Sequence, residues 1–210
     1  MTFHSTNARE NSALLTLGGM ALIASGIQPV DRLTWMMEIF PILIVAPILI
    51  LTAARFPLTP LLYHLIFLHA LVLMLGGHYT YAQTPVGFWL QDMLHLDRNP
   101  YDRIGHLLQG FVPAIAVREI LLRKTDLRRG AMLAFLSVSV CLAFSAFYEL
   151  IEWWSALALG QGADAFLGTQ GDPWDTQWDM FCALIGACAA LIFLGDMHDR
   201  HLRRMISPLY

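Results

Sequence analysis

The sequence has few charged residues for its length. Of its 210 residues only 14% are charged, whereas 57% are hydrophobic. About a quarter of the residues in an ordinary soluble domain are charged, so this composition argues against a soluble protein and favours a membrane protein. The length is also too short for several domains. We therefore expect one transmembrane domain that covers residues 1–210.

Cysteine is scarce as well. Cys141, Cys182 and Cys188 are odd in number, lie in apolar segments and lack the spacing of metal ligands. They imply no disulfide framework, and we interpret them as small packing residues. The net charge of −3 carries little information by itself, because in a membrane protein the distribution of Lys and Arg matters more than their sum.

Long apolar runs dominate what the sequence does contain. They predict an all-α, polytopic membrane helix bundle with about six transmembrane helices. A single Arg before the first run, together with the length of that run, favours an uncleaved helix over a signal peptide. A short surface helix is expected around residues 86–94. The six predicted spans are residues 13–30, 33–54, 58–79, 101–122, 131–158 and 173–194.

The basic residues predict the orientation of the bundle. Six spans place both termini on one side, and this topology puts ten of the 13 Lys and Arg residues on that side. Cytoplasmic loops are rich in Lys and Arg, so we expect cytoplasmic N- and C-termini. Only Arg32, Arg98 and Arg103 remain for the outer side. All tryptophans then lie near the outer face, as in an interfacial aromatic belt: Trp35, Trp89, Trp153, Trp154, Trp174 and Trp178.

Three ionisable side chains stand at the start of the fourth span. Asn99 is expected to be its N-cap, and Pro100 its first helical residue. Asp102 and His106 are four residues apart, so they project from one helix face, one turn apart. A functional pair is one interpretation. The alternative is that Asp102 only compensates the first-turn N–H groups and the helix dipole.

A second acidic group lies late in the fifth span. Glu149 comes 18 residues after Ala131, which places it about 27 Å along a hydrocarbon core of about 30 Å. Glu152 shares its face, and Ser145 and Tyr148 continue the stripe. Two neighbouring carboxylates in a low-dielectric setting need a cation, a shared proton or water. Exposure at the level of the lipid headgroups is the alternative.

The start of the sixth span repeats the pattern of the fourth. Residues 172–179 contain a capping Asp, then Pro, an aromatic residue and Asp175, and end at Asp179, which corresponds to His106. Two similar helix caps would explain this repeat. Alternatively, both helices present the same ligand geometry to one cavity. His78, at the outer end of the third span, completes the set.

Four predicted helices thus bring acidic or imidazole groups to one level. The excess of negative charge favours a divalent cation, and Arg103 is placed to neutralise one carboxylate. Mixed nitrogen and oxygen ligands suit Zn²⁺, Mn²⁺ or Fe²⁺, and a carboxylate majority also admits Mg²⁺ or Ca²⁺. We assign candidate catalytic roles, as general bases, to Glu152 and Asp179. The candidate metal ligands are His78, Asp102, His106, Glu149 and Asp175.

These segments resemble a known family. Residues 78–82, 101–111, 148–153 and 166–179 are similar to the YjdF-type family of uncharacterised bacterial inner-membrane proteins, and the resemblance covers nearly the whole chain. It implies a multispanning protein of the bacterial inner membrane and no particular activity. A fainter similarity to VanZ-like membrane proteins implies an envelope-related substrate. The chain departs from that second pattern at Glu152, where Gln is common, and near Ala183, where Asn would be expected.

Three classes of function fit such a site. The first is a metal-assisted hydrolase or transferase that acts at the outer leaflet on a lipid or lipid-linked envelope molecule, with residues 159–171 as a lid. The second is binding or transport of a cation, a proton or a small solute, although no second acidic cluster is evident deeper in the membrane. The third is a structural role. Membrane lipids are the expected partners; nucleic acid is not expected, and no protein partner is indicated.

Overall fold

The computed structural model describes residues 3–160 and 164–206, and within these ranges all regular secondary structure is helical. The helices follow one another along the chain without a strand between them in the described ranges. They are α1 (Phe3–Ser25), α2 (Arg32–Thr52), α3 (Pro60–Tyr79), α4 (Pro85–Leu94), α5 (Tyr101–Lys124), α6 (Ala131–Leu159), α7 (Asp164–Leu167) and α8 (Asp175–Ile206).

Five helices of the described chain are long and apolar enough to cross a membrane: α2, α3, α5, α6 and α8. Their outer surfaces carry large apolar side chains that no protein covers. Leu51, Ile192 and Phe193, for example, are 79%, 75% and 74% exposed. Lipid is the solvent in which such a surface is stable. The predicted all-α membrane bundle is therefore confirmed.

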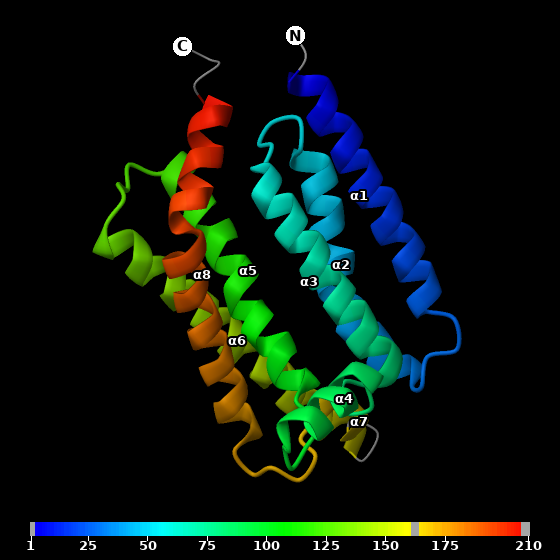
Figure 1. The fold of residues 1–210 in the computed structure, drawn as a ribbon. Helices are drawn as coiled ribbons and strands as arrows, with labels where there is room; N and C mark the ends of the chain where they lie inside the picture. Colours follow the sequence, from blue (N-terminus) through cyan, green and yellow to red (C-terminus); the bar gives the residue numbers. More distant parts are fainter. Residues whose placement is uncertain (1–2, 161–163, 207–210) are drawn as a thin grey trace.

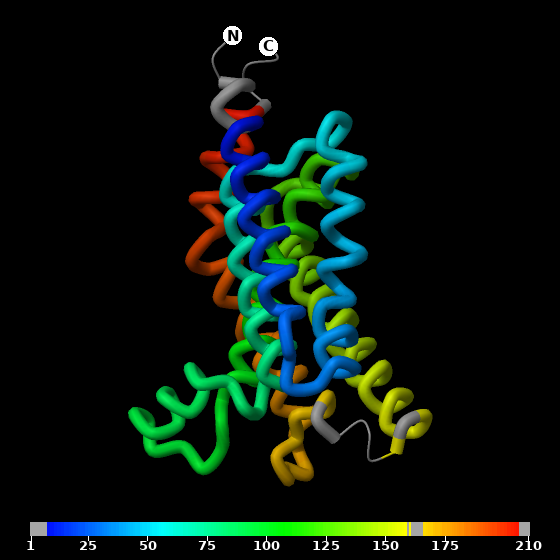
Figure 2. Tube along the Cα trace, turned by 90° about the vertical axis from the view of Figure 1, so that its right-hand side faces the viewer, coloured from blue at the N-terminus to red at the C-terminus, as the bar shows by residue number. Residues whose placement is uncertain are grey.

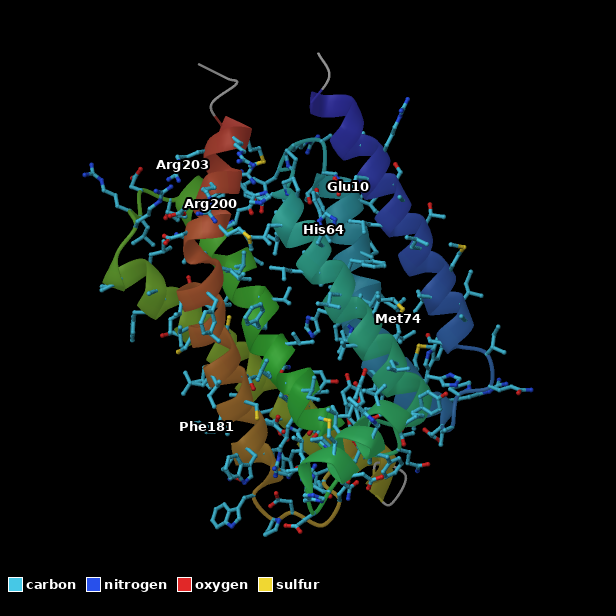
Figure 3. All side chains as sticks on the ribbon, viewed as in Figure 1. Glu10, His64, Met74, Phe181, Arg200 and Arg203 are labelled. Carbon is cyan, nitrogen blue, oxygen red and sulfur yellow. The ribbon has the colours of Figure 1, made fainter. Side chains whose placement is uncertain are left out.

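The first predicted span, residues 13–30, differs most from the structure. α1 ends at Ser25, and Gln28 then has a left-handed backbone (φ 53°) that turns the chain away from the helix. Polar residues such as Glu10 make α1 too polar to count with the five spans named above. The helix nevertheless packs along α3, as Figures 1 and 2 show. The Oε1 atom of Glu10 also lies 3.1 Å from Nε2 of His64 in α3; both residues are labelled in Figure 3.

Other boundaries shift by less. The predicted surface helix is present as α4, and α5 begins at Tyr101, so Pro100 is its N-cap rather than the predicted first helical residue. α8 begins at Asp175 and runs to Ile206, well beyond the predicted end at residue 194. The extension is polar and contains His198, a buried side chain that bonds to α5. Hydropathy alone does not predict the last turns of α8, because polar contacts with α5 stabilise them.

Helices α5 and α8 form the closest pair in the bundle. Gly110 of α5 faces the backbone of Ala183, and Gly186 of α8 faces the backbone of Leu107 and Phe111. A Cβ atom at either glycine would overlap the other helix. Small residues of this kind let two helices approach closely in a membrane. A fully buried apolar cluster continues the contact, with members from α3, α5, α6 and α8: Leu62, Ala114, Ile115, Cys141, Ala187 and Ala190.

The remaining helices surround this pair (Figure 1). α6 packs against both α5 and α8, α3 packs against α5, and α1 and α2 pack against α3. The first turns of α1 and the last turns of α8 lie at one end of the bundle, whereas α4 and α7 lie at the other (Figure 1). We call the end with α4 and α7 the α4 end. Both α5 and α8 begin there.

Substitution of Gly186 by Ala should destabilise the protein, because the added methyl group meets the backbone of α5. Overpacking of this kind typically costs about 1–3 kcal/mol. Gly195→Ala in the same helix is the matched control, since a Cβ atom there meets nothing within 4 Å. That variant should gain about 0.5–1 kcal/mol from helix propensity. Thermal unfolding in detergent checks both signs, and equal midpoints for the two variants would contradict the packing.

Candidate functional site

Asp102, His106 and Asp179 meet where α5 and α8 begin. The Nε2 atom of His106 lies 3.6 Å from Oδ1 of Asp102 and 3.9 Å from Oδ2 of Asp179. One ligand atom from each of the three residues lies within 4.8 Å of the others. The three side chains are only 7%, 6% and 1% exposed. Among the described residues, this is the group of His, Cys, Asp and Glu side chains close enough to hold a metal ion.

Similar local structures start the two helices. The Oδ1 atom of Asn99 accepts a hydrogen bond from the N–H of Tyr101 (3.0 Å), and Oδ1 of Asp172 accepts one from the N–H of Trp174 (2.9 Å). A proline separates donor and acceptor in both cases, and α5 starts one residue later than an Asn99 N-cap would require. The repeat in the sequence therefore corresponds to two similar caps. It also brings His106 and Asp179 to the same cluster.

Gln109 orients the imidazole of His106. Its Oε1 atom lies 2.8 Å from Nδ1 of His106. An amide oxygen can only accept, so Nδ1 carries the proton and donates it. The lone pair of His106 is then on Nε2, which faces Asp102 and Asp179. A hydrogen bond of this kind behind the ring is typical of histidines that bind metal.

Helix α6 adds two more carboxylates. The Oε1 atom of Glu149 lies 3.8 Å from Nδ1 of His106, and neither carboxylate oxygen of Glu149 has a hydrogen-bond partner although the residue is 7% exposed. Glu152, one turn further along α6, is 8% exposed. Tyr148 packs edge-on against His106 and donates a 3.4 Å hydrogen bond to Glu38 of α2. Of the stripe predicted on the fifth span, Ser145, Glu149 and Glu152 are buried and Tyr148 is partly buried.

Arg98 contacts several of the predicted acidic residues. It donates a short hydrogen bond to Asp175 and lies 3.5 Å from Asp172 and 3.7 Å from Asp102. Asp175 is thereby paired with a guanidinium and does not belong to the three-residue cluster. The sequence analysis missed this role of Arg98. Arg98 lies before the first helical residue of α5, so helical spacing to Asp102 could not have indicated it.

Residues 166–172 cover the cluster, and we call them the cover segment. Phe166 packs against Tyr148, and the carbonyl of Gly168 accepts a 3.1 Å hydrogen bond from Arg98. Asp172 accepts a 2.8 Å bond from Arg103, as expected for a cation that neutralises one carboxylate. Part of the predicted lid, residues 161–163, lies outside the described residues. Within the described remainder, Phe166 and Gly168 contact residues of the site.

Like Asp175 and Glu149, His78 is a predicted ligand that does not belong to the three-residue cluster. Its Nδ1 atom lies 2.8 Å from the carbonyl oxygen of Ser25, and its own carbonyl accepts a 2.9 Å hydrogen bond from the N–H of Val30. The residue thus bonds on both sides to the connection between α1 and α2. Its position along α3 was predicted well, but the direction of the side chain depends on which helix packs beside it.

The charges at the α4 end do not balance. Seven carboxylates gather around His106, Tyr148 and Arg98: Glu38, Asp102, Glu149, Glu152, Asp172, Asp175 and Asp179. Of these, Asp172 and Asp175 form short bonds with Arg103 and Arg98. Buried carboxylates without a cationic partner are strongly disfavoured, so protons or a bound cation must compensate them. Those that form no ion pair with Arg or Lys in the described chain are Glu38, Glu149, Glu152 and Asp179.

Comparison with known proteins decides the family. A family profile described as "Predicted membrane protein (DUF2238)" matches residues 11–200. The chain is also 61% identical to "Inner membrane protein YjdF" of Escherichia coli (strain K12) over 194 residues, which is 92% of each chain.

The chain belongs to the DUF2238 family. The predicted resemblance to YjdF-type proteins is therefore confirmed, and the chain is an integral protein of the bacterial inner membrane. No solved structure matches it.

This family member has a second polar cluster at the opposite end of the bundle, which the sequence analysis did not find. Glu119 of α5 is fully buried and accepts hydrogen bonds from Thr59, Arg123 and His198. His198 in turn contacts Arg118 at 2.7 Å. The carboxylate here has several partners, so this cluster has no excess of unpaired acid. We therefore interpret this cluster as a structural network that stabilises this end of the bundle, and not as a binding site.

Arg98→Gln should destabilise the protein strongly, because it leaves Asp175 buried without its partner. Breaking a buried ion pair costs about 3–5 kcal/mol. Arg103→Gln is the control, since the Arg103 side chain is 30% exposed and, among the described residues, pairs with Asp172 and lies over the Trp178 ring. Thermal unfolding in detergent should show the larger loss for Arg98→Gln and partial recovery on adding Asp175→Asn. Equal losses for the two arginine variants would argue against the assigned role.

Proposed function

We propose that the protein binds a divalent cation through Asp102, His106 and Asp179 and acts as a hydrolase or transferase on a lipid or lipid-linked envelope molecule. The observation that carries this proposal is the cluster itself, in which three buried ligand atoms lie within 4.8 Å of one another. Oxygen atoms of Asp102 and Asp179 have no hydrogen-bond partner in the described structure. A cation would satisfy them.

The donor atoms fit a catalytic metal. One imidazole nitrogen and two carboxylates suit Zn²⁺ or Mn²⁺, and the carboxylates also admit Mg²⁺. Three protein ligands leave coordination positions open, as in catalytic rather than structural zinc sites. When bound, such a metal supplies a water molecule of lowered pKa and a Lewis acid for a carbonyl or phosphoryl oxygen. The protonated Nδ1 of His106, held by Gln109, leaves Nε2 for the metal.

The other acidic residues around the metal would then have different roles. Asp179, first considered as a general base, lies among the ligand atoms and is better suited to hold the metal. Glu149 and Glu152 form no ion pair with an arginine or lysine of the described chain, so either can accept a proton from water. Arg98 holds Asp175 away from the ligand set and balances the charge of Asp102. The cover segment excludes bulk water from the cluster.

Transport is the second candidate, and the packing argues against it. Along α5 and α8, fully buried apolar residues such as Ile115 and Ala187 lie between the site and the polar cluster around Glu119. A cation that crossed the bundle would lose its polar contacts in this layer. The site is therefore better suited to chemistry or binding at one membrane face.

We further propose that the α4 end faces the periplasm, with both termini in the cytoplasm. The basic residues support this orientation, since those of α8, such as Arg200 and Arg203, lie towards the end opposite α4 (Figure 3). A lipid-linked envelope molecule would reach the site from the outer leaflet in this arrangement.

Two single-cysteine variants test the orientation. Asp97 and Asp126 are exposed residues in connections at opposite ends of the bundle. In a background without the three native cysteines, a membrane-impermeant maleimide should label Asp97→Cys in intact cells. It should label Asp126→Cys only after the membrane is permeabilised. The reverse pattern would place the site on the cytoplasmic side and remove the envelope substrate from the proposal.

Metal analysis tests the site. Protein purified in detergent without chelator, after supplementation with Zn²⁺, Mn²⁺ or Mg²⁺, should contain near-stoichiometric metal. Asp102→Asn, His106→Ala and Asp179→Asn should each lose most of it, and metal should raise the thermal midpoint of the parent alone. Gln109→Leu should weaken binding about 10- to 100-fold, because the ligand histidine loses its orienting partner.

Asp175→Asn and His78→Ala are the matched controls. Both residues are candidate ligands by sequence, but their side chains bond to Arg98 and Ser25. Both variants should keep the metal if they remain folded, as judged by a single symmetric peak in gel filtration. A parent protein without stoichiometric metal under all three supplements would overturn the metalloenzyme proposal.

A further inference from the structure

Helix α4 is amphipathic. Val86, Trp89 and Met93 recur at intervals of three and four residues and so share one face, which Leu90 and Leu94 extend. Asp92 lies on another side of the helix, together with Phe88, and the exposed His95 ends the helix with a left-handed backbone (φ 53°). The apolar face is not covered by the rest of the described chain: Val86, Trp89, Met93 and Leu94 are 45%, 62%, 51% and 56% exposed.

The helix is fixed to the bundle at one end only. Gly87 is its one buried residue and lies against the side chain of Asn99, which also donates a 3.1 Å hydrogen bond to the carbonyl of Thr84. Beyond this anchor, α4 projects sideways from the bundle, as the chain around residues 85–95 shows in Figure 2. Its direction is therefore set by contacts at its start, and its apolar face is free.

We infer that α4 lies flat in the lipid–water boundary, with Trp89 and Met93 inserted among the lipids of the leaflet on the site's side. The bilayer is the occupant that the position selects, because α4 connects the ends of two membrane-spanning helices, α3 and α5. Helices of this kind place an apolar face in the boundary between headgroups and acyl chains and a polar face in water.

The level of the tryptophans supports this placement. At the ends of α6 and α8 nearest α4, four tryptophans are 45–63% exposed, and such residues mark the membrane interface. Trp89 continues this belt outward from the bundle. The four are Trp153, Trp154, Trp174 and Trp178.

The placement has a consequence for the site. Arg98 and Asn99 lie in the short connection between α4 and α5, and Arg98 contacts Asp102 and Asp175. A helix held by lipid therefore fixes the connection that carries Arg98. The inference does not depend on a bound cation or on catalysis.

Spin labels at four positions test the inference. In the cysteine-free background, Trp89→Cys and Met93→Cys report on the apolar face. Asp92→Cys, away from that face, and His95→Cys, at the exposed residue that ends the helix, are the matched controls. The labelled proteins are reconstituted in vesicles of phosphatidylethanolamine and phosphatidylglycerol. Relaxation by oxygen, which concentrates in lipid, is then compared with relaxation by a water-soluble nickel chelate.

Labels at 89 and 93 should be relaxed more by oxygen than by nickel, and labels at 92 and 95 more by nickel. A stronger nickel effect at all four positions would show that α4 stays in water and would overturn the inference. Protection of 89 and 93 from both reagents would overturn it too, since it would mean that protein covers the face. Leu94→Cys replaces either apolar position if that variant fails to fold.

Discussion

The contact of α5 with α8 is the constraint on which the rest of the structure depends. Gly110 and Gly186 let the two backbones touch, and in a membrane such contact must come from close packing because lipid gives no hydrophobic force between helices. Since both helices begin at the same end, the contact also fixes the relative height of their first turns. Asp102 and His106 thereby meet Asp179 instead of facing lipid. A site of three side chains is therefore a product of backbone packing several residues away from it.

The buried carboxylates at the two ends of the bundle differ in how their charge is compensated. Around Glu119, hydrogen-bond donors from three elements satisfy the carboxylate, and the cluster is complete without a ligand. Around His106, carboxylates outnumber the cations, and both oxygens of Glu149 remain without a partner. Proteins maintain such imbalance only where something compensates it. The difference between the two clusters is a stronger indication of function than the number of acidic residues at either.

Much of the fold could be predicted from the sequence, because hydropathy and helix length follow from the bilayer itself. The pair of Asp102 and His106 could also be predicted, since spacing along one helix fixes which side chains share a face. The partners across helices could not. His78 bonds to Ser25 because the end of α1 lies beside α3. The hydrophobic periodicity within α3 does not indicate which helix packs beside it. Gln109 was missed for the same reason, as its role exists only once His106 has a fixed ring orientation.

The side-chain amide of Gln170 forms hydrogen bonds with both the backbone N–H and the backbone carbonyl of Asn99. It accepts a 3.1 Å hydrogen bond from the Asn99 N–H and donates a 3.0 Å bond to the Asn99 carbonyl, as a neighbouring β-strand would. Asn99 is almost fully buried, so removal of Gln170 leaves a peptide group unpaired in a place that water does not easily reach. Lifting the cover segment must therefore loosen the chain next to Arg98 as well. Displacement of the cover segment would break the two bonds to Asn99 and the bond from Arg98 to the Gly168 carbonyl together.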